Sequence, residues 1–216
     1  MDFLYTIVEF FTTGGLFMYP ILIVFAVGLA IAIERYITLT MVTRRNRRVW
    51  EQVQPLLDQA QFEEARVMTS NDESTISQVL SMGLSLQGAV HRREDIEIAM
   101  EERMMGIVPR LEKRTPYVAL ASSIATLLGL LGTIMGLIQA FTAVANANPA
   151  DKADLLSASI SVAMNTTAFG LMVAIPLLVI HAILTSKTGD IIDSLEMATV
   201  KSLNVFSRNA RRVAGE

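Results

Sequence analysis

Three long runs of apolar residues stand out along this chain, and a stretch rich in charged residues separates the first run from the second. The runs cover residues 16–33, 117–144 and 157–184. A helix needs about 20 apolar residues to cross a hydrocarbon core about 30 Å thick. The second and third runs exceed that length, so we expect them to tilt or to extend beyond the bilayer. The pattern predicts three transmembrane helices.

The charged stretch also carries a helical pattern. Apolar residues recur at helical spacing between residues 49 and 68, and the Ser-Asn-Asp-Glu-Ser sequence at 70–74 predicts a turn. Residues 94–114 are charged and helix-favouring and lead straight into the second apolar run. We therefore predict one continuous helix there, with kinks at Pro109 and Pro116. The predicted fold is an all-α membrane protein with three transmembrane helices and long cytoplasmic helical extensions.

Lysine and arginine lie on one side of the predicted membrane. The N-terminus before the first run has neither, and the loop at 145–156 has only Lys152. By the positive-inside rule, the N-terminus and this loop lie outside, and residues 35–116 and the tail lie in the cytoplasm. The N-terminus also lacks the basic region of a cleaved signal peptide, so we expect the first run to stay in the membrane. The cytoplasmic flanks carry Arg35, Arg44, Arg45, Arg47 and Arg48 after the first run and Lys187, Lys201, Arg208, Arg211 and Arg212 after the third.

This topology divides the chain into four parts. Residues 1–40 hold the outer N-terminal segment and the first transmembrane helix, and residues 41–116 form a cytoplasmic helical region. Residues 117–186 hold the second and third transmembrane helices, and residues 187–216 form a cytoplasmic C-terminal helix. Glu34 and Arg35 end the first span, where we expect their charged ends to snorkel to the inner interface. The arginines at 44–48 are expected to contact anionic membrane lipids.

Composition agrees with a membrane protein and excludes several functions. Hydrophobic residues make up 52% of the chain, and its mean hydropathy is +0.45. The formal net charge of −3 indicates no nucleic-acid partner. The chain has no cysteine, and its two histidines, His91 and His181, are far apart. We therefore predict no bound metal, no cofactor and no enzyme activity, because no set of nucleophile, base and metal ligands can be assembled.

Small and hydroxyl-bearing residues form a stripe on each of the last two spans. They recur at steps of three or four, so each set shares one helix face. Two interpretations are open: the stripes are seams where helices pack closely, or they line a hydrated space between several subunits. The stripes are Ser122, Thr126, Gly129, Thr133, Gly136 and Ala140 on the second span, and Ser159, Ala163, Thr167, Gly170 and Ala174 on the third.

The spans lack a carboxylate at mid-membrane depth. Between residues 117 and 184, the charged residues and histidines are Asp151, Lys152, Asp154 and His181, all in the outer loop or near the inner end of the third span. Transporters usually need an intramembrane ionisable group to bind and release an ion. If this protein moves ions, another chain must supply the carboxylate.

Two motifs resemble the MotA/TolQ/ExbB channel family. The first is Gly-Leu-Leu-Gly-Thr-Ile-Met-Gly-Leu-Ile-Gln-Ala-Phe at 129–141, and the second is Thr-Ala-Phe-Gly-Leu-Met-Val-Ala-Ile-Pro at 167–176. Glu34 and Arg35 after a proline-containing first span also fit this family. In length and topology the chain is similar to the TolQ/ExbB branch.

The resemblance implies an assembly in the bacterial inner membrane. Family members form a pentameric ring around two single-span helices of the ExbD/TolR/MotB type, whose aspartate binds the ion. Thr133 and Thr167 match the family's pore-lining threonines, beside the small residues Gly129, Gly136, Gly170 and Ala174. Ion flow is then expected to turn the ring around its partner and to do work at the cell envelope.

The sequence departs from the ExbB and TolQ pattern at two positions. Val162 stands where those proteins typically carry a glutamate, five residues before Thr167. Thr166 and Thr167 form a doublet similar to that of sodium-driven stators, and hydroxyl oxygens suit a dehydrated cation. This favours sodium over protons, with transient binding at Thr133 and Thr167; alternatively, Thr166 packs against a neighbouring subunit.

Other classes of protein fit the sequence less well. A non-conducting membrane scaffold would use the stripes only for packing. A flagellar-type stator subunit would belong to a branch with four spans. A self-contained transporter is the weakest alternative, because no charged residue lies within the spans.

Overall fold

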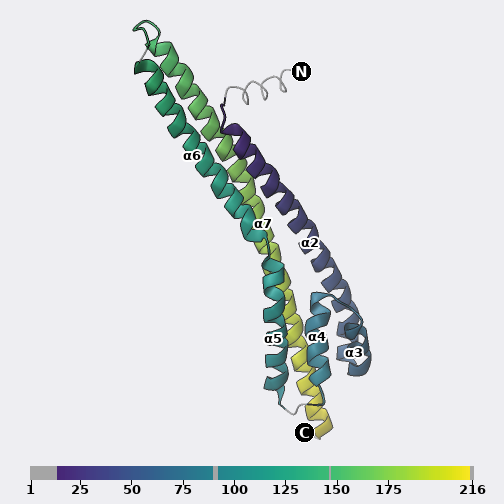
Figure 1. The fold of residues 1–216 in the computed structure, drawn as a ribbon. Helices are drawn as coiled ribbons and strands as arrows, with labels where there is room; N and C mark the ends of the chain where they lie inside the picture. The colour runs from purple at the N-terminus through teal and green to yellow at the C-terminus, as the bar shows by residue number, and fades with distance from the viewer. Residues whose placement is uncertain (1–13, 90–91, 146, 215–216) are drawn as a thin grey trace, which may run out of the picture. The chain divides into compact units, whose positions relative to one another are not determined.

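The computed structural model describes residues 14–89, 92–145 and 147–214 and builds them as α-helices joined by short connections (Figure 1). The expectation of a retained N-terminus rests largely on residues 1–13, which lie outside the described residues. His91 also lies outside them. The helices, in chain order, are α2 (Met18–Asp58), α3 (Phe62–Ser70), α4 (Thr75–Leu86), α5 (Arg93–Glu112), α6 (Thr115–Ala145) and α7 (Lys152–Ala214).

Three helical stretches are long and apolar enough to cross a membrane, judged by length and composition. They are Met18–Asp58, Arg93–Ala145 and Lys152–Ala210, and they contain the three apolar runs, except that α2 begins two residues after the first run does. The prediction of an all-α membrane protein with three long apolar helices is confirmed.

The helix before the second span is interrupted where the sequence predicted continuity. α5 ends at Glu112 and α6 begins at Thr115, and between them Arg114 has a positive φ of 68°. Pro109 lies inside α5, and Pro116 lies in the first turn of α6. Proline is tolerated in a first turn because the backbone N–H groups there have no partner within the helix. The interruption therefore lies at 113–114 rather than at either proline.

The helices group into two compact units. Unit 1 comprises Met1–Glu34 and Arg114–Ile183, and unit 2 comprises Arg35–Lys113 and Leu184–Glu216. In unit 1, a Cβ atom on Gly28 would lie 3.0 Å from the Cβ of Ala121 and 3.2 Å from Cδ1 of Leu177. Many large apolar side chains of this unit face outward, among them Leu127, Phe141, Met164, Ile175 and Val179. Such a surface suits lipid or neighbouring subunits rather than water.

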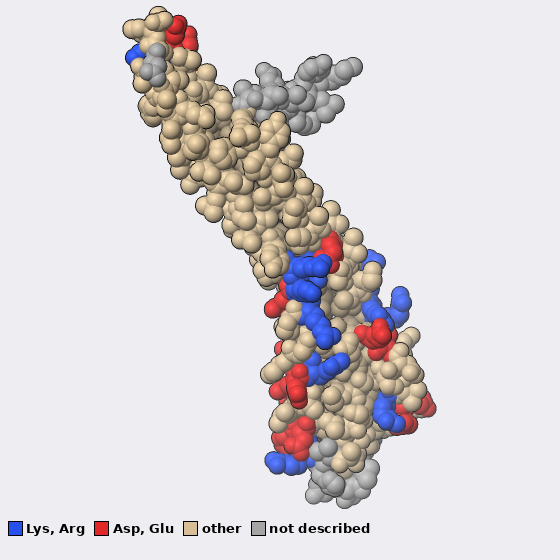
Figure 2. All heavy atoms as spheres, in the orientation of Figure 1, with Lys and Arg blue, Asp and Glu red and all other residues tan. Residues whose placement is uncertain are grey.

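Unit 2 has the opposite distribution, with apolar side chains inside and charges outside. Phe62 of α3 and Phe206 of α7 meet edge to face, with ring centroids 5.5 Å apart. Figure 2 shows lysine, arginine, aspartate and glutamate side chains gathered over this unit, while most of the surface of unit 1 is uncharged. The fully buried side chains of unit 2 include Leu39, Val53, Leu57, Leu80, Met100, Ile191, Leu195 and Leu203.

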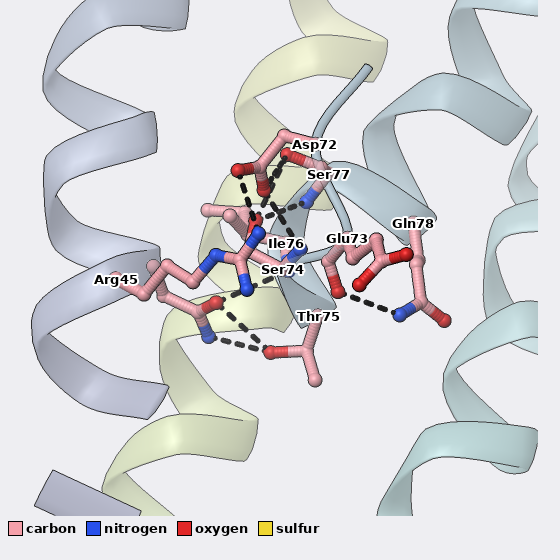
Figure 3. Close-up of polar contacts among 9 residues, drawn as sticks. Arg45, Asp72, Glu73, Ser74, Thr75, Ile76, Ser77 and Gln78 are labelled. Carbon is pink, nitrogen blue, oxygen red and sulfur yellow. Dashed lines mark hydrogen bonds and ion pairs between the residues drawn. The ribbon is translucent and has the colours of Figure 1, made fainter. Parts of the chain in front are cut away.

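A polar network anchors the turn between α3 and α4, which lies where the sequence predicted it (Figure 3). Asp72 accepts hydrogen bonds from the Ser74 backbone N–H at 2.7 Å and from Ser77 Oγ at 3.0 Å. Arg45 of α2 forms an ion pair with Asp72 at 3.1 Å. Partial burial alone would raise the pKa of Asp72, but hydrogen bonds from Ser74, Arg45 and Ser77 lower that pKa to about 2.

Asn46 makes a second connection between α2 and α4. Its side-chain nitrogen donates to Thr75 Oγ1 at 2.7 Å, and its oxygen accepts from the Ile76 N–H at 3.3 Å. Asn46 is buried, and the first N–H groups of a helix have no intrahelical partner, so this amide satisfies one of them. Together with Asp72 it holds the start of α4 against α2.

Candidate ion path at the α6–α7 seam

The two small-residue stripes face each other within one chain. A Cβ atom built on Gly170 would lie 2.8 Å from the backbone oxygen of Ala125 and 3.0 Å from Cα of Gly129. A Cβ on Gly136 would lie 2.8 Å from the Cβ of Ala163. Real Cβ atoms do not approach backbone atoms that closely, so glycine is what allows α6 and α7 to pack at this distance.

Two hydroxyl groups bond across this seam. Ser122 Oγ donates to the Ala174 carbonyl at 2.8 Å, and Thr167 Oγ1 donates to the Gly129 carbonyl at 2.8 Å. Ser122 is almost completely buried, whereas Thr167 is half-buried. Each hydroxyl donates to a carbonyl of the neighbouring helix instead of to one of its own helix. These hydrogen bonds therefore strengthen a helix contact that small residues make possible.

Thr166 points into a different part of unit 1. It is 2% exposed, and its hydroxyl donates to the Gly14 carbonyl at 2.5 Å and to the Val162 carbonyl at 3.0 Å. Its methyl group lies against the position that a Cβ on Gly132 would occupy. Thr166 therefore packs α7 against α6 and against the segment that precedes α2, all within one chain.

Thr133 lies beside the seam. Its side chain is partly exposed, and its hydroxyl donates to the Leu130 carbonyl of its own helix at 2.6 Å. Among the described residues, no hydrogen bond joins Thr133 to Thr167. The structure thus buries Thr166 and leaves Thr133 and Thr167 both partly exposed.

Glu34 and Arg35 contact different segments. Glu34 forms an ion pair with Arg114 at 3.5 Å within unit 1. Arg35 is 5% exposed, and its guanidinium donates to the Leu111 carbonyl within unit 2. The last carbonyls of a helix have no intrahelical partner, and Arg35 satisfies one at the end of α5. The sequence predicted that Glu34 and Arg35 lie at the interface. It did not reveal their partners, Arg114 and Leu111, which are at least 76 residues further along the chain.

Sequence reasoning did not single out Gly132, although it stands between Gly129 and Gly136 at helical spacing. A Cβ at this position would collide with the side chain of Thr166. Its spacing within the motif at 129–141 could have indicated Gly132. Its partner, Thr166 of α7, could not be identified, because periodicity does not show which residue lies opposite.

The groups that form hydrogen bonds across the α6–α7 seam are polar but uncharged. Hydroxyl and carbonyl oxygens line the seam, and no group of three or more histidine, cysteine, aspartate or glutamate residues that could hold a metal ion occurs in the part of the chain that the structure describes. Among the described residues that meet at the seam, the arrangement offers weak oxygen ligands and no carboxylate or histidine.

The fold and the seam define a class of protein. It is a membrane protein of three long apolar helices, whose last two spans pack closely through glycine residues and a threonine hydrogen bond. The sequence matches the MotA/TolQ/ExbB proton channel family over residues 71–197, which is more than half of the chain and includes both motifs. The chain belongs to this family.

Individual relatives agree with this assignment. The chain is 26% identical over its whole length to a putative biopolymer transport protein ExbB homolog of Methanothermobacter thermautotrophicus, of which the alignment covers 75%. It is 37% identical over 36% of its length to a putative biopolymer transport protein ExbB-like 2 of Helicobacter pylori, covering 51% of that protein. It is 36% identical over 36% of its length to the Tol-Pal system protein TolQ of Haemophilus influenzae, covering 34% of that protein.

Proposed function

We propose that this chain is the ring subunit of an ion-driven rotary motor in the bacterial inner membrane. In this proposal, copies of the chain form a pentamer around a dimer of an ExbD/TolR/MotB-like partner and convert ion-motive force into mechanical work at the cell envelope. The observation that carries the proposal is the seam lined by Thr167 and its neighbours. The chain belongs to a channel family, and the described apolar runs contain no carboxylate at mid-membrane depth.

The missing carboxylate supports a partner of defined chemistry. An ion path needs a group that binds and releases the ion, and the described spans offer only hydroxyl and carbonyl oxygens at depth. An aspartate on the partner's single span supplies that group. The outward-facing apolar side chains of α6 and α7 provide surface for neighbouring subunits and lipid.

The driving ion is proposed to be sodium or protons, with the threonine doublet favouring sodium. Thr133 and Thr167 would offer oxygen ligands transiently, because a hydroxyl that donates its hydrogen retains lone pairs. Thr166 is buried and already donates to two carbonyls, so its contribution would be to shape the seam around Thr167. Val162 in place of a glutamate leaves this path without a charge of its own.

Contact with membrane lipids is proposed at the cytoplasmic end of the first span. In unit 2, a cavity of about 590 Å³ is lined by Tyr36, Ile37 and Met41 and, further along α2, by Arg44 and Arg48. Apolar groups next to cations suit the acyl chain and headgroup of an anionic lipid.

The test is ion uptake by cells that express the chain with its single-span partner, in buffered media with and without sodium. We expect Thr167→Val and Thr133→Val to lower uptake at least about tenfold, because the variants keep the side-chain shape but lose the oxygen ligand. Thr167→Ser retains the hydroxyl and is expected to retain uptake. Ser123→Ala is the matched control, because that hydroxyl bonds only within α6, to Ala119, off the stripe.

A non-conducting scaffold is the second candidate, and the cross-helix bonds of Ser122 and Thr167 favour it equally, because they also serve packing. Normal uptake in both valine variants would reject the ion-path assignment. No uptake by the wild-type complex, although it purifies intact, would support the scaffold. Uptake that requires sodium would identify the ion, and sodium-independent uptake would mean protons.

A further inference from the structure

Unit 2 contains a second cavity, separate from the threonine seam. It has a volume of about 600 Å³ and lies among α2, the first turn of α5 and the last part of α7. Small-molecule sites usually measure about 300–1,000 Å³. The cavity is lined mainly by Trp50 and Gln54 of α2, Arg93 of α5, and Lys201, Asn204 and Arg208 of α7.

The cavity has an excess of positive charge. Arg93, Lys201 and Arg208 line it, against one carboxylate, that of Asp58. Within the described ranges, no carboxylate lies within ion-pair distance of these three cations, whereas Arg45, Arg47 and Arg66 of the same unit each have a carboxylate partner. Cations that outnumber the carboxylates around them favour an anion.

Two of the cations are held in place by neutral partners. Arg93 donates to the side-chain oxygen of Asn204 at 3.3 Å, and the ammonium of Lys201 lies 5.7 Å from the ring centroid of Trp50. These contacts orient the charged groups without neutralising them. Arginine in particular binds phosphate with paired hydrogen bonds, and lysine binds it as a point charge.

The remaining lining is suited to a flat ring. Trp50 is partly exposed, and the apolar side chains of Leu57 and Val205 and the amide of Gln54 line the same cavity. Nucleobases stack on aromatic side chains in single-stranded nucleic-acid sites, because every base has a flat aromatic face. An anion that also carries an aromatic ring would contact both kinds of surface.

The position along α2 favours a soluble ligand over a lipid. Trp50 follows Arg35 by four helical turns, about 22 Å along the helix. If Arg35 lies at the inner interface, as the proposed topology requires, Trp50 lies beyond the lipid contact proposed at Arg44 and Arg48. Trp50 also points about 200° around α2 from Arg48, away from that contact, and the two cavities share no residue. This step rests on the cytoplasmic orientation of unit 2 and not on ion conduction.

We propose that this cavity binds a soluble ligand of the nucleotide class, with its phosphates at Arg93, Lys201 and Arg208 and its ring against Trp50. Such a ligand would join α2, α5 and α7 and so connect the cytoplasmic unit to the concentration of a metabolite. The site lies in unit 2 and shares no residue with Thr133, Thr166 or Thr167 of unit 1.

Trp50 is the only tryptophan of the chain, so its fluorescence reports on this cavity alone. The full-length chain in detergent would be titrated with ATP and, separately, with inorganic tripolyphosphate, and calorimetry would measure the same binding. We expect ATP to change Trp50 emission saturably and to bind more tightly than tripolyphosphate. Arg93→Ala and Lys201→Ala should each weaken ATP binding at least about tenfold.

Arg47→Ala is the matched control, because Arg47 is exposed on α2, pairs with Glu51 and does not line the cavity. Circular dichroism would show that every variant keeps its helices. Equal affinity for ATP and tripolyphosphate would reject the ring contact. Loss of binding in Arg47→Ala as well would indicate unspecific charge attraction and overturn the site. Absence of saturable binding at millimolar ATP, or ATP binding abolished by micelles containing phosphatidylglycerol, would also overturn it.

Discussion

Thr166 and Thr167 are neighbours in the chain, yet their hydroxyl groups bond to segments far apart in the sequence. Thr166 donates to Gly14 and Thr167 donates to Gly129. Successive side chains on a helix point about 100° apart, so a doublet on a buried helix meets two different neighbours. A doublet therefore does not by itself make a two-oxygen ion site, and the two threonines need separate substitutions.

Asp72 carries the pH dependence that we expect of unit 2. Its pKa is lowered from 3.8 to about 2 by hydrogen bonds, despite partial burial. A carboxylate whose folded-state pKa is lowered stabilises the fold above its unfolded pKa, and this contribution is lost as the pH falls from about 4 toward 2. At neutral pH the contribution is on the order of 2 kcal/mol.

Asp72→Asn should therefore lower the thermal stability of unit 2 at pH 7 and flatten its dependence on pH between 4 and about 2. Helix content followed by circular dichroism during heating in detergent measures both effects. Glu73→Gln in the same turn is the control, because only the backbone carbonyl of Glu73 joins the polar contacts there. Equal losses of stability in the two variants would show that the Asp72 network does not stabilise the fold.

At the scale of the helices, the two parts of α7 along its length pack in different ways. Its first part packs on α6 through small residues, and its last part packs in unit 2 through Ile191, Leu195 and Leu203. The sequence predicted separate elements here, a span and a cytoplasmic helix, and the structure builds both as one helix from Lys152 to Ala214. A change in environment along a helix does not require a break in it.

Two glycines of α7 allow a matched comparison. A Cβ on Gly170 would lie 2.8 Å from the backbone oxygen of Ala125, whereas a Cβ on Gly189 would have no atom within 4 Å. Gly170→Ala should destabilise the α6–α7 contact by about 1–3 kcal/mol, because the backbones must separate. Gly189→Ala should stabilise the helix by up to about 1 kcal/mol, because alanine is the better helix former.

Unfolding of the two variants in detergent, followed by helix content, would measure the difference. The same substitution in the same helix isolates the effect of the seam from that of helix propensity. If Gly170→Ala were as stable as Gly189→Ala, the close approach of α6 and α7 at Gly129 and Gly170 would be wrong.

At the scale of the whole molecule, the two units bury their apolar side chains differently because they face different solvents. Unit 1 exposes leucine, isoleucine and phenylalanine, and unit 2 buries them beneath charged residues. In lipid, apolar side chains gain nothing from burial, so small residues make the contacts between helices instead. The proposed topology places unit 2 in the cytoplasm.

The chain has no cysteine, so single-cysteine variants report topology without background. Asn148→Cys in the loop between α6 and α7 should react with an impermeant maleimide in intact spheroplasts. Gln59→Cys, just after α2, should react only after lysis, because the arginines near it keep that side in the cytoplasm. Both positions are exposed, so accessibility within the chain does not distinguish them. The reverse labelling pattern would invert the topology.

The sequence by itself determined the three apolar helices, the turn at 70–74 and the family. Span length and helical spacing are local properties, and the family motifs at 129–141 and 167–176 are contiguous in the chain. The same local pattern also identified the small faces of α6 and α7. It could not decide between a packing seam and a pore lining, because periodicity shows which residues share a face and not what that face contacts.

Only the tertiary structure decided which groups meet. The bond from Thr166 to Gly14, the bond from Arg35 to Leu111 and the anchoring of α4 by Asn46 join residues far apart in the chain. The cavity around Trp50 likewise combines α2, α5 and α7. Partners of this kind depend on how helices pack, and packing follows from the shapes of all the contacting side chains together, which no single segment of sequence contains.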